Sequence, residues 1–368
     1  MTTRICVIIP GFGDGGAQRQ CIRTINALSL RPDVSVDLIY FYEGIHFPLI
    51  EKDRIQLHKV AVRSNYNPLV ILKLHKIVRR LAPDAIMTWL HSCDVYGAAL
   101  KRMNPDIAWV MTERDSRYAR DFRFQLRRAL GRHADGIIAN SPAGREYWTS
   151  AGASCPITVV SNIVDLDLTS PPADGIEDAN VLYVGRLETQ KNVESVVEAF
   201  CDLADRRSDL SFAVIGNGSQ RSELENQVHS RGHIDRVRFL GFRRDAGDFI
   251  RRARVLVSLS HHEGAPNVVL EAIAAGTPVI ASDIPEHRDL LGDEYPFYIA
   301  ERKSGVKVAA RIEMALESSD SAWALDYGRR VIKEMTADVI AAKYHNEIER
   351  VIRSMRLSAS GPVPNPVV

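Results

Sequence analysis

Two glutamates separated by seven residues are the first candidates for chemistry. They are Glu263 and Glu271 in the segment Ser260-His-His-Glu-Gly-Ala-Pro-Asn-Val-Val-Leu-Glu. The apolar run before this segment predicts a strand, and Asn267 is expected to cap a helix that begins at Val268. Glu263 then lies in a loop at a strand's carboxyl end and Glu271 one turn into the helix, so both can face one crevice. The backbone between them and the helix N-terminus predict a phosphate site, made by Gly264, Ala265, Pro266, Asn267 and Val268.

This segment, with the Gly276-Thr-Pro-Val-Ile-Ala-Ser-Asp that follows it, resembles the E-x7-E signature of retaining glycosyltransferases of the GT-B fold, family 4. Further matches come in the family's order along nearly the whole chain. They are Gly15-Gly-Ala-Gln-Arg19 for G-G-A-x-R, Asn162-Ile-Val-Asp165 for N-G-V-D with Ile163 in place of the usual glycine, Val184-Gly-Arg-Leu187 with Lys191-Asn192 for V-G-R-L…K-N, and Gly216-Asn-Gly218 for a G-x-G turn.

The resemblance implies a role for each matched residue. Glu263 would hold sugar hydroxyls and Glu271 the ribose, and Arg186 and Lys191 the diphosphate of the donor. Chemistry supports the two cations, because a diphosphate leaving group gains charge as the glycosidic bond breaks, and fixed cations stabilise that transition state. The expected catalytic set is Glu263, Arg186, Lys191 and His91, and the donor site is expected to add Gly15, Gly16, Gly216 and the segment 264–271.

Three residues of the first half follow predicted strands in the same way. His91 comes after the strand 85–88, where family members often carry a histidine that contacts the transferred sugar. Glu113 and Arg114 follow the strand 107–111, and Arg114 is suited to an anionic ligand. We therefore expect Glu113 and Arg114 at the acceptor site. A loop position in solvent is the competing interpretation for all three.

Several motifs suggest other functions. Gly11-Phe-Gly-Asp-Gly-Gly16 fits the dinucleotide fingerprint G-x-G-x-x-G and hence an NAD-dependent oxidoreductase, but no acid ends the second strand and Glu43 comes late. Asp165-Leu-Asp167 matches the metal-binding D-x-D of another glycosyltransferase fold; at a linker we interpret it as structural. His261, His262 and Glu263 are adjacent and are not expected to converge on a metal. A sugar-nucleotide epimerase of the same fold and a non-catalytic binding subunit also remain open.

The elements that must position these residues alternate along the chain. Short β-branched runs and longer amphipathic stretches predict an α/β protein with two Rossmann-like, doubly wound parallel sheets, in which ligands bind beyond the carboxyl ends of the strands. We expect an acceptor domain over 1–168 and a donor domain over 176–336, with a crevice between them. The linker 169–175 joins them, the helix 337–357 returns to the first domain, and 358–368 is expected to be a disordered tail.

Composition and charge narrow the function classes. The 368 residues carry a net charge of only +1, but residues 1–170 have 22 basic and 16 acidic side chains. Most of that excess lies in 70–132, which predicts either a solvated face or contact with an anionic membrane surface; nucleic acid is not expected as a partner. Five cysteines without a C-x-x-C pair, no signal peptide and no apolar run of membrane-spanning length predict a cytoplasmic protein. If the basic region contacts a membrane, the protein is expected to be peripheral at its inner face.

Together these observations predict one activity. The chain is expected to be a retaining, metal-independent hexosyltransferase without a cofactor, with a nucleotide-diphosphate sugar as co-substrate. A UDP-sugar is preferred to a GDP-sugar as the donor. The acceptor is expected to be a saccharide or lipid-linked saccharide in bacterial cell-surface polysaccharide biosynthesis.

Overall fold

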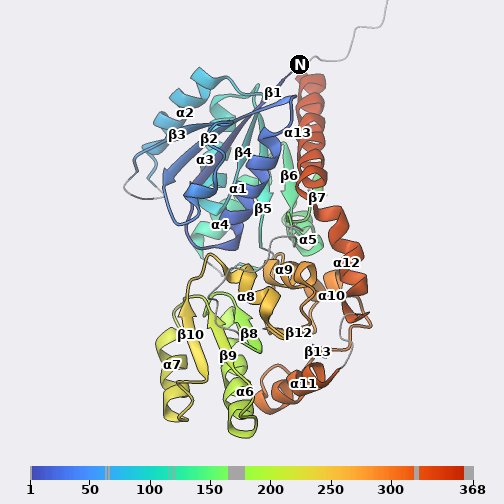
Figure 1. Ribbon diagram of the computed structural model, residues 1–368. Coiled ribbons are helices and arrows are strands. Elements are labelled where there is room, and N and C mark those ends of the chain that lie inside the picture. The colour runs from blue at the N-terminus through green and yellow to red at the C-terminus, as the bar shows by residue number, and fades with distance from the viewer. Residues whose placement is uncertain are drawn as a thin grey trace, which may run out of the picture. The chain divides into compact units, whose positions relative to one another are not determined.

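A computed structural model of the chain describes residues 2–62, 64, 67–115, 117–118, 121–164, 179–318 and 323–359 (Figure 1). The predicted linker 169–175, the Asp165-x-Asp167 pair and most of the predicted tail lie outside these residues. The chain divides into two compact units. The first contains the described residues up to Ile163 and those from Ala337 onward, and the second contains those of Val164–Thr336.

The first unit is built on a parallel sheet, which has seven strands in the described residues, in the order β3-β2-β1-β4-β5-β6-β7. Every neighbouring pair is parallel, so the carboxyl ends of all these strands lie at one edge of the sheet. The strands are β1 (Thr3–Gly11), β2 (Val34–Tyr42), β3 (Ile55–Lys59), β4 (Ala85–Thr88), β5 (Ala108–Glu113), β6 (Gly136–Ala139) and β7 (Ile157–Val159).

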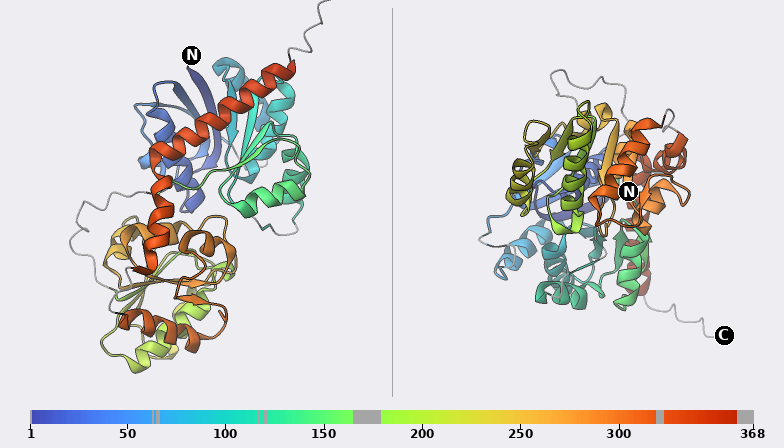
Figure 2. Two further views of the ribbon diagram at one scale, coloured as in Figure 1. Left: turned by 90° about the vertical axis from the view of Figure 1, so that its right-hand side faces the viewer. Right: turned by 90° about the horizontal axis from the view of Figure 1, so that it is seen from below.

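Helices cover both faces of this sheet, as the residues of β1 show. Ile5, Val7 and Ile9 face a core cluster shared with α1 and α13, whereas Cys6 and Ile8 face one shared with α2, α3 and α5. Figure 2 shows α13 running along the first unit. The helices are α1 (Gly16–Ser29), α2 (Val70–Leu81), α3 (His91–Met103), α4 (Phe122–Gly131), α5 (Pro142–Ser150) and α13 (Ala337–Ala359), with the short 3-10 helix η1 (Phe47–Leu49).

The second unit contains another parallel sheet, of six strands in the described residues, in the order β10-β9-β8-β11-β12-β13. Its strands are β8 (Val181–Val184), β9 (Phe212–Ile215), β10 (Val237–Gly241), β11 (Val255–Ser258), β12 (Val279–Ser282) and β13 (Tyr298–Ile299). Its helices are α6 (Val193–Arg206), α7 (Arg221–Ser230), α8 (Ala246–Arg252), α9 (Asn267–Ala275), α10 (Pro285–Leu291), α11 (Gly305–Glu317) and α12 (Asp326–Ile332), with the short 3-10 helices η2 (Thr189–Lys191), η3 (Trp323–Leu325) and η4 (Lys333–Met335).

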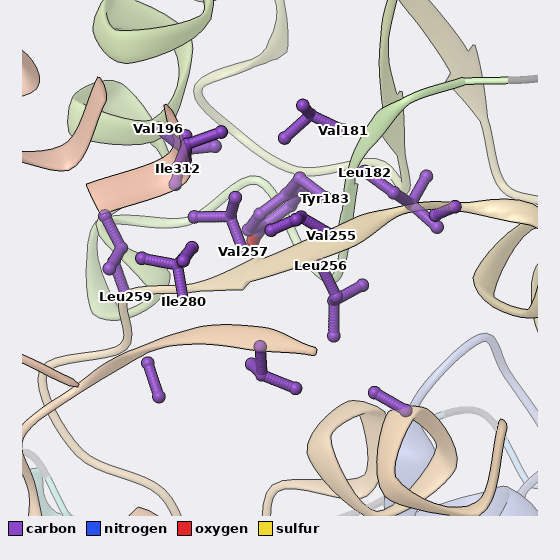
Figure 3. Close-up of a cluster of buried hydrophobic side chains, with 14 of the residues drawn as sticks. Val181, Leu182, Tyr183, Val196, Val255, Leu256, Val257, Leu259, Ile280 and Ile312 are labelled. Carbon is purple, nitrogen blue, oxygen red and sulfur yellow. The ribbon is translucent and has the colours of Figure 1, made fainter. Parts of the chain in front are cut away.

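The core of the second unit lies around its two central strands. Side chains of β8 and β11 meet Val196 from α6 and Ile312 from α11 (Figure 3). Tyr183 and Val257 are almost wholly buried there. Because β8 and β11 are rigidly packed, the loops that leave their carboxyl ends start from fixed points, and these loops carry the predicted donor residues.

The alternation of strands and helices was predicted correctly, and the two Rossmann-like parallel sheets confirm the expected fold class. Among the strands and α-helices, two were not predicted: β3, whose sequence Ile-Gln-Leu-His-Lys mixes polar and apolar residues, and α10, a helix of seven residues. The start of α9 was predicted one residue late. Asn267 is already helical, and Pro266 occupies the cap position without a side-chain hydrogen bond.

Candidate functional site

The loop between β11 and α9 carries Glu263 at the carboxyl edge of the second sheet. The side chain is only 5 % exposed. Its Oε1 accepts hydrogen bonds from Ser260 Oγ and from Lys191 Nζ, both at 2.5 Å. Burial alone would raise the pKa of Glu263, but the Lys191 charge and the two hydrogen bonds outweigh it and lower the pKa. Glu263 is therefore a carboxylate, held by a cation that comes from a different loop.

That cation stands on η2, which follows β8. Asn192, at the end of η2, has a left-handed backbone with φ of 51°, and α6 begins directly after it. Lys191 therefore points from a tight turn at the edge where Glu263 lies, with 18 % of its side chain exposed. The structure thus brings together two residues that the sequence placed 72 positions apart.

Arg186 reaches the same region through Gln190. The Arg186 guanidinium is exposed and donates to Gln190 Oε1 at 3.0 Å, while Gln190 Nε2 donates to the carbonyl of His262 at 3.0 Å. The His261 N–H also donates to the Gln190 carbonyl, at 2.9 Å. Gln190 thereby ties the loop of the two cations to the loop of Glu263. It was missed in the sequence because a glutamine in a loop has no chemical signature of its own.

A second layer of polar side chains supports the Glu263 loop. Arg302 donates to the carbonyls of Ser260 and His261, at 3.2 and 3.3 Å, and Ser282 Oγ donates to Ser260 O at 2.7 Å. The fully buried His287 lies within 2.8 Å of the Ser282 carbonyl through Nδ1. Arg302 and Ser282 stand at or near the ends of β13 and β12, a position that was available in the sequence as a signal.

The remaining residues of the second unit that the sequence predicts at the donor site lie on two backbone features. Gly264 and Pro266 are buried, and Ala265, Asn267, Val268 and Glu271 are partly exposed along the first turns of α9. The N-terminus of such a helix favours an anion. Gly216 has φ of 136°, and a Cβ there would lie 1.9 Å from the carbonyl oxygen of Gly185, so only glycine fits this close approach of two loops. A direct contact of Gly216 with a donor stays a prediction.

Gly15 and Gly16 lie in the first unit, where Gly16 begins α1. Gly15 is the cap residue and offers no side-chain hydrogen bond, and the first turn of α1 has no acidic residue. The glycine motif over 11–16 therefore links β1 to α1 as a dinucleotide fingerprint would. However, Glu43, the nearest acid after β2, is paired with Lys59 at 2.7 Å rather than free for a ribose. Donor binding by Gly15 and Gly16 remains a prediction.

His91 is the first residue of α3, just beyond the carboxyl end of β4. Its ring centroid lies 5.2 Å from that of Phe124, which α4 supplies. Burial, followed by the charges of Arg127 and Arg123, lowers the pKa of His91. The imidazole is therefore neutral at physiological pH and suited to hydrogen bonding rather than to ion pairing.

The expectation that Glu113 contacts an acceptor requires correction. Glu113 is fully buried, and its carboxylate is enclosed by protein donors. Arg127 Nη1 lies 2.9 Å and Trp148 Nε1 2.6 Å from Oε2, while the Tyr118 hydroxyl and two backbone N–H groups donate to Oε1. Arg127 also binds Asp94 at 2.7 Å. Glu113 therefore belongs to a buried ionic network, and no oxygen is presented to a substrate.

Arg114 is also engaged within the first unit. Its guanidinium lies 3.8 Å from the ring centroid of Trp89 and donates to Asn162 Oδ1 at 3.2 Å and to the Tyr344 hydroxyl. These partners come from the end of β4, the segment after β7 and α13. Within the described residues, no carboxylate forms a salt bridge with Arg114, so its charge remains suited to the anionic ligand that the sequence predicts, and that role stays a prediction.

The basic region 70–132 divides into exposed and buried parts. Lys73, Lys76, Arg79 and Arg80 are exposed on α2. Leu69 and Leu72 beside them are 70 % and 62 % exposed, and Phe122 at the start of α4 is 73 % exposed. Arg127, in contrast, is 2 % exposed, so this basic residue of the region belongs neither to a solvated face nor to a membrane contact. No helix in the described residues is long and apolar enough to cross a membrane.

Comparisons with known proteins identify the family that the chain resembles. The family model "Glycosyltransferase Family 4" matches residues 14–168, and the model "Glycosyl transferases group 1" matches 173–331. The lipopolysaccharide core biosynthesis glycosyltransferase LpsE of Rhizobium meliloti is 27 % identical over 280 residues, which are 74 % of this chain and 77 % of LpsE. A Campylobacter jejuni N-acetylgalactosaminyltransferase that acts on a diphospho-undecaprenol-linked sugar is 24 % identical over 319 residues, covering 79 % of this chain and 84 % of that protein.

Solved structures show the same fold. Anabaena HepE in complex with UDP and glucose superposes with a TM-score of 0.78 at 19 % identity, over 98 % of this chain and 100 % of that one. Sucrose-phosphate synthase from Thermosynechococcus elongatus superposes with a TM-score of 0.77 at 19 % identity, over 96 % of this chain and 100 % of that one. At this identity the likeness shows the architecture alone.

Proposed function

Because the chain belongs to glycosyltransferase family 4 and has the GT-B fold, we propose that it transfers a sugar, with retention of configuration and without a metal ion, from a UDP-sugar to a saccharide or lipid-linked saccharide. The observation that carries this proposal is the Lys191–Glu263 pair at the carboxyl edge of the second sheet, with Arg186 tied to it through Gln190. The preference for UDP is supported by the neighbour that binds UDP and glucose.

In this proposal the two cations act on the leaving group. As the bond between the anomeric carbon and the diphosphate oxygen breaks, the diphosphate gains negative charge, and Arg186 and Lys191 stabilise it. The acceptor oxygen forms its bond to the anomeric carbon on the same face. Its proton passes to an oxygen of the departing diphosphate. No protein nucleophile is needed, and we name none.

Glu263 has a role that follows from its burial. A carboxylate held by Lys191 and Ser260 is fixed in position and stays ionised, so it can accept hydrogen bonds from sugar hydroxyls. When the donor binds, Lys191 interacts with both the Glu263 carboxylate and the diphosphate. Glu271, one turn into α9 and partly exposed, binds the ribose in this scheme.

The test is a panel of UDP-, GDP- and ADP-sugars, scored by thermal shift and by slow hydrolysis of the donor. We expect stabilisation and hydrolysis with a UDP-sugar, and a large loss of both in the Lys191→Ala variant. Preference for a GDP-sugar would overturn the donor assignment. An isomerised nucleotide sugar formed without any acceptor would instead support the epimerase, which the comparisons do not favour.

The acceptor is proposed to lie at the inner membrane surface, in cell-surface polysaccharide assembly. Relatives that build lipopolysaccharide core or act on an undecaprenol-linked sugar support this class. The exposed cations of α2 beside Leu69 and Leu72 provide a surface that suits anionic lipid. We propose α2 rather than the arginines of α4 as the main contact.

Liposome co-sedimentation tests this surface. We expect salt-sensitive binding to anionic vesicles that is lost when Lys73, Lys76 and Arg80 are changed to glutamate. The control is the same charge reversal at Lys52 and Arg353, exposed cations outside the region. Binding that is unaltered by the α2 changes, or absent at low salt in the unmodified protein, would contradict the membrane proposal.

A further inference from the structure

Leu90 has a backbone conformation that leucine rarely adopts. Its φ is 73° and its ψ 152°. Among the described residues, the other non-glycine residues with positive φ are Ala82 and Asn192, and both lie in the left-handed helical region. The conformation of Leu90 falls instead in a region that is almost reserved for glycine, where a Cβ is strained. Such strain persists only when the surrounding structure enforces it.

The backbone on the amino-terminal side of Leu90 is fixed by Trp89. The Trp89 N–H donates to the carbonyl of Ile8 in the neighbouring strand β1, at 2.9 Å. The Trp89 indole Nε1 donates to the carbonyl of Ala17 in α1, also at 2.9 Å. Trp89 is completely buried. Neither its backbone nor its side chain can therefore rotate to relieve the strain that follows.

The backbone on the carboxyl-terminal side is fixed by Asp94. Thr88 Oγ1 donates to Asp94 Oδ1 at 2.6 Å, and Arg127 Nε donates to Oδ2 at 2.7 Å. Asp94 is 1 % exposed. The side chain of Leu90 itself packs against the core cluster of α1 and α13. The turn from β4 into α3 is thus held at both ends and anchored in its middle.

The residue that this turn presents is His91. Its imidazole rests on Phe124, and its backbone direction is set by the two dihedral angles of Leu90. A glycine would adopt this conformation without strain but would have no side chain to anchor, so the turn would lose its fixed direction. Leucine at this position is therefore explained by its side chain, which anchors the turn that carries His91.

We infer that Leu90 is a positioning residue, whose strained and anchored backbone directs the imidazole of His91 toward the transferred sugar. This inference rests on the proposed glycosyl transfer and on the predicted contact of His91 with that sugar. It concerns the direction of one side chain, whereas the proposed function concerns the reaction as a whole. The two can therefore be tested separately.

The strain is tested without substrate. We compare the thermal midpoints of Leu90→Ala and Leu90→Gly, which remove the same packing but differ in the Cβ. We expect the glycine variant to be the more stable, a reversal of the usual order. The matched control is Leu30, an exposed leucine with φ of −77°, where alanine should be the more stable. If the alanine variant had the higher thermal midpoint at both positions, Leu90 would not be strained.

The positioning role is tested by a double-mutant cycle of Leu90→Gly and His91→Ala, with kcat and donor KM measured for each variant. We expect Leu90→Gly to lower kcat by about 10-fold or more with the donor KM unchanged, because a misdirected group costs rate rather than affinity. In the His91→Ala background the same change should cost nothing further.

Equal losses in both backgrounds would show that Leu90 acts independently of His91 and would overturn the inference. A fully active His91→Ala variant would overturn it as well, since Leu90 would then have no catalytic group to position. Absence of any transfer by the unmodified protein would instead refute the proposed function. The thermal midpoints of Leu90→Ala and Leu90→Gly would still show whether the backbone at position 90 is strained.

Discussion

Each sheet of the protein has a buried glutamate paired with a cation at its carboxyl edge, and the two pairs differ in what surrounds them. In the first unit, Arg127 is 2 % exposed and lies between Glu113 and Asp94, and donors of the protein occupy these carboxylates. In the second unit, Lys191 is partly exposed, and Arg186, which donates to the neighbouring Gln190, is exposed. The closed network stabilises the fold, whereas the open pair keeps charge available to a ligand. The residue types of the two pairs are similar, and the solvent exposure of the cation distinguishes them.

The largest expected effect is on stability, in the closed network. Changing Arg127 to methionine would leave Glu113 and Asp94 buried without their cation. We expect a loss of roughly 3–5 kcal/mol in the free energy of unfolding, or failure to fold. Denaturant titration measures it, with Arg128→Met as the control on the exposed side of α4. Equal stability of the two variants would show that the network is not structural.

The next effect is on activity, at the two cations Lys191 and Arg186 of the second unit. Lys191→Ala and Arg186→Ala should each lower kcat by about 10²–10³-fold, because one charge-assisted contact to the transition state is worth roughly 2–4 kcal/mol. The thermal midpoint should change little in Arg186→Ala, since that side chain is exposed. It should fall in Lys191→Ala, because Glu263 then stays buried without its cation. Lys307→Ala, an exposed lysine of α11, is the control. Near-normal turnover in a folded double variant would remove both residues from the site.

A smaller effect separates the two glutamates of the second unit. Glu263→Gln should lower the transfer rate, because the carboxylate that accepts from Lys191 is lost. Glu271→Gln should mainly weaken the affinity for free nucleoside diphosphate. Calorimetric titration of UDP into both variants measures this difference. An unchanged affinity for UDP in Glu271→Gln would contradict its assignment to the ribose.

The buried carboxylates Asp94 and Glu263 should affect the pH dependence of stability in opposite directions. Burial raises the pKa of Asp94 to about 6, against the opposing charge of Arg127. The folded state then holds a proton that the unfolded state releases near pH 4, so Asp94 makes stability fall as the pH rises from about 4 to 6, by up to about 3 kcal/mol. The lowered pKa of Glu263 has the opposite effect: the stability that this carboxylate contributes is lost as the pH falls through its lowered pKa.

The Asp94→Asn variant tests the first of these effects. Its free energy of unfolding between pH 4.5 and 7 should depend less on pH than that of the unmodified protein. Parallel profiles of the two proteins would refute the raised pKa of Asp94.

The smallest expected effect is that of metal removal. Because Arg186 and Lys191 are proposed to neutralise the diphosphate, the protein should retain its transfer activity in EDTA. Donor hydrolysis and transfer, measured in chelator and after addition of magnesium or manganese, check this expectation. Complete loss in chelator that either metal restores would show that the cations do not suffice and would return attention to Asp165 and Asp167.

Much of the fold, and the placement of several residues of the candidate site, could be predicted from the sequence because their determinants are local. A β-branched run buried on both faces predicts a parallel strand wherever it occurs, and a polar loop after it must lie at the carboxyl edge of the sheet. Arg186, Lys191 and Glu263 could be placed at one edge by this argument alone. Elements with weak patterns were missed, such as β3, in which polar side chains interrupt the apolar ones.

Only the tertiary structure decided which of the charged loop residues are open to a ligand. The sequence predicts that Glu113 and Glu263 each follow a strand, and nothing local distinguishes them. In the structure Glu113 is the last residue of β5 and is enclosed by Arg127 from α4 and Trp148 from α5. The link of Gln190 to His262 and the support from Arg302 join residues at least 40 positions apart. Burial and hydrogen bonding depend on neighbours in space, and packing, rather than local spacing, brings those neighbours together.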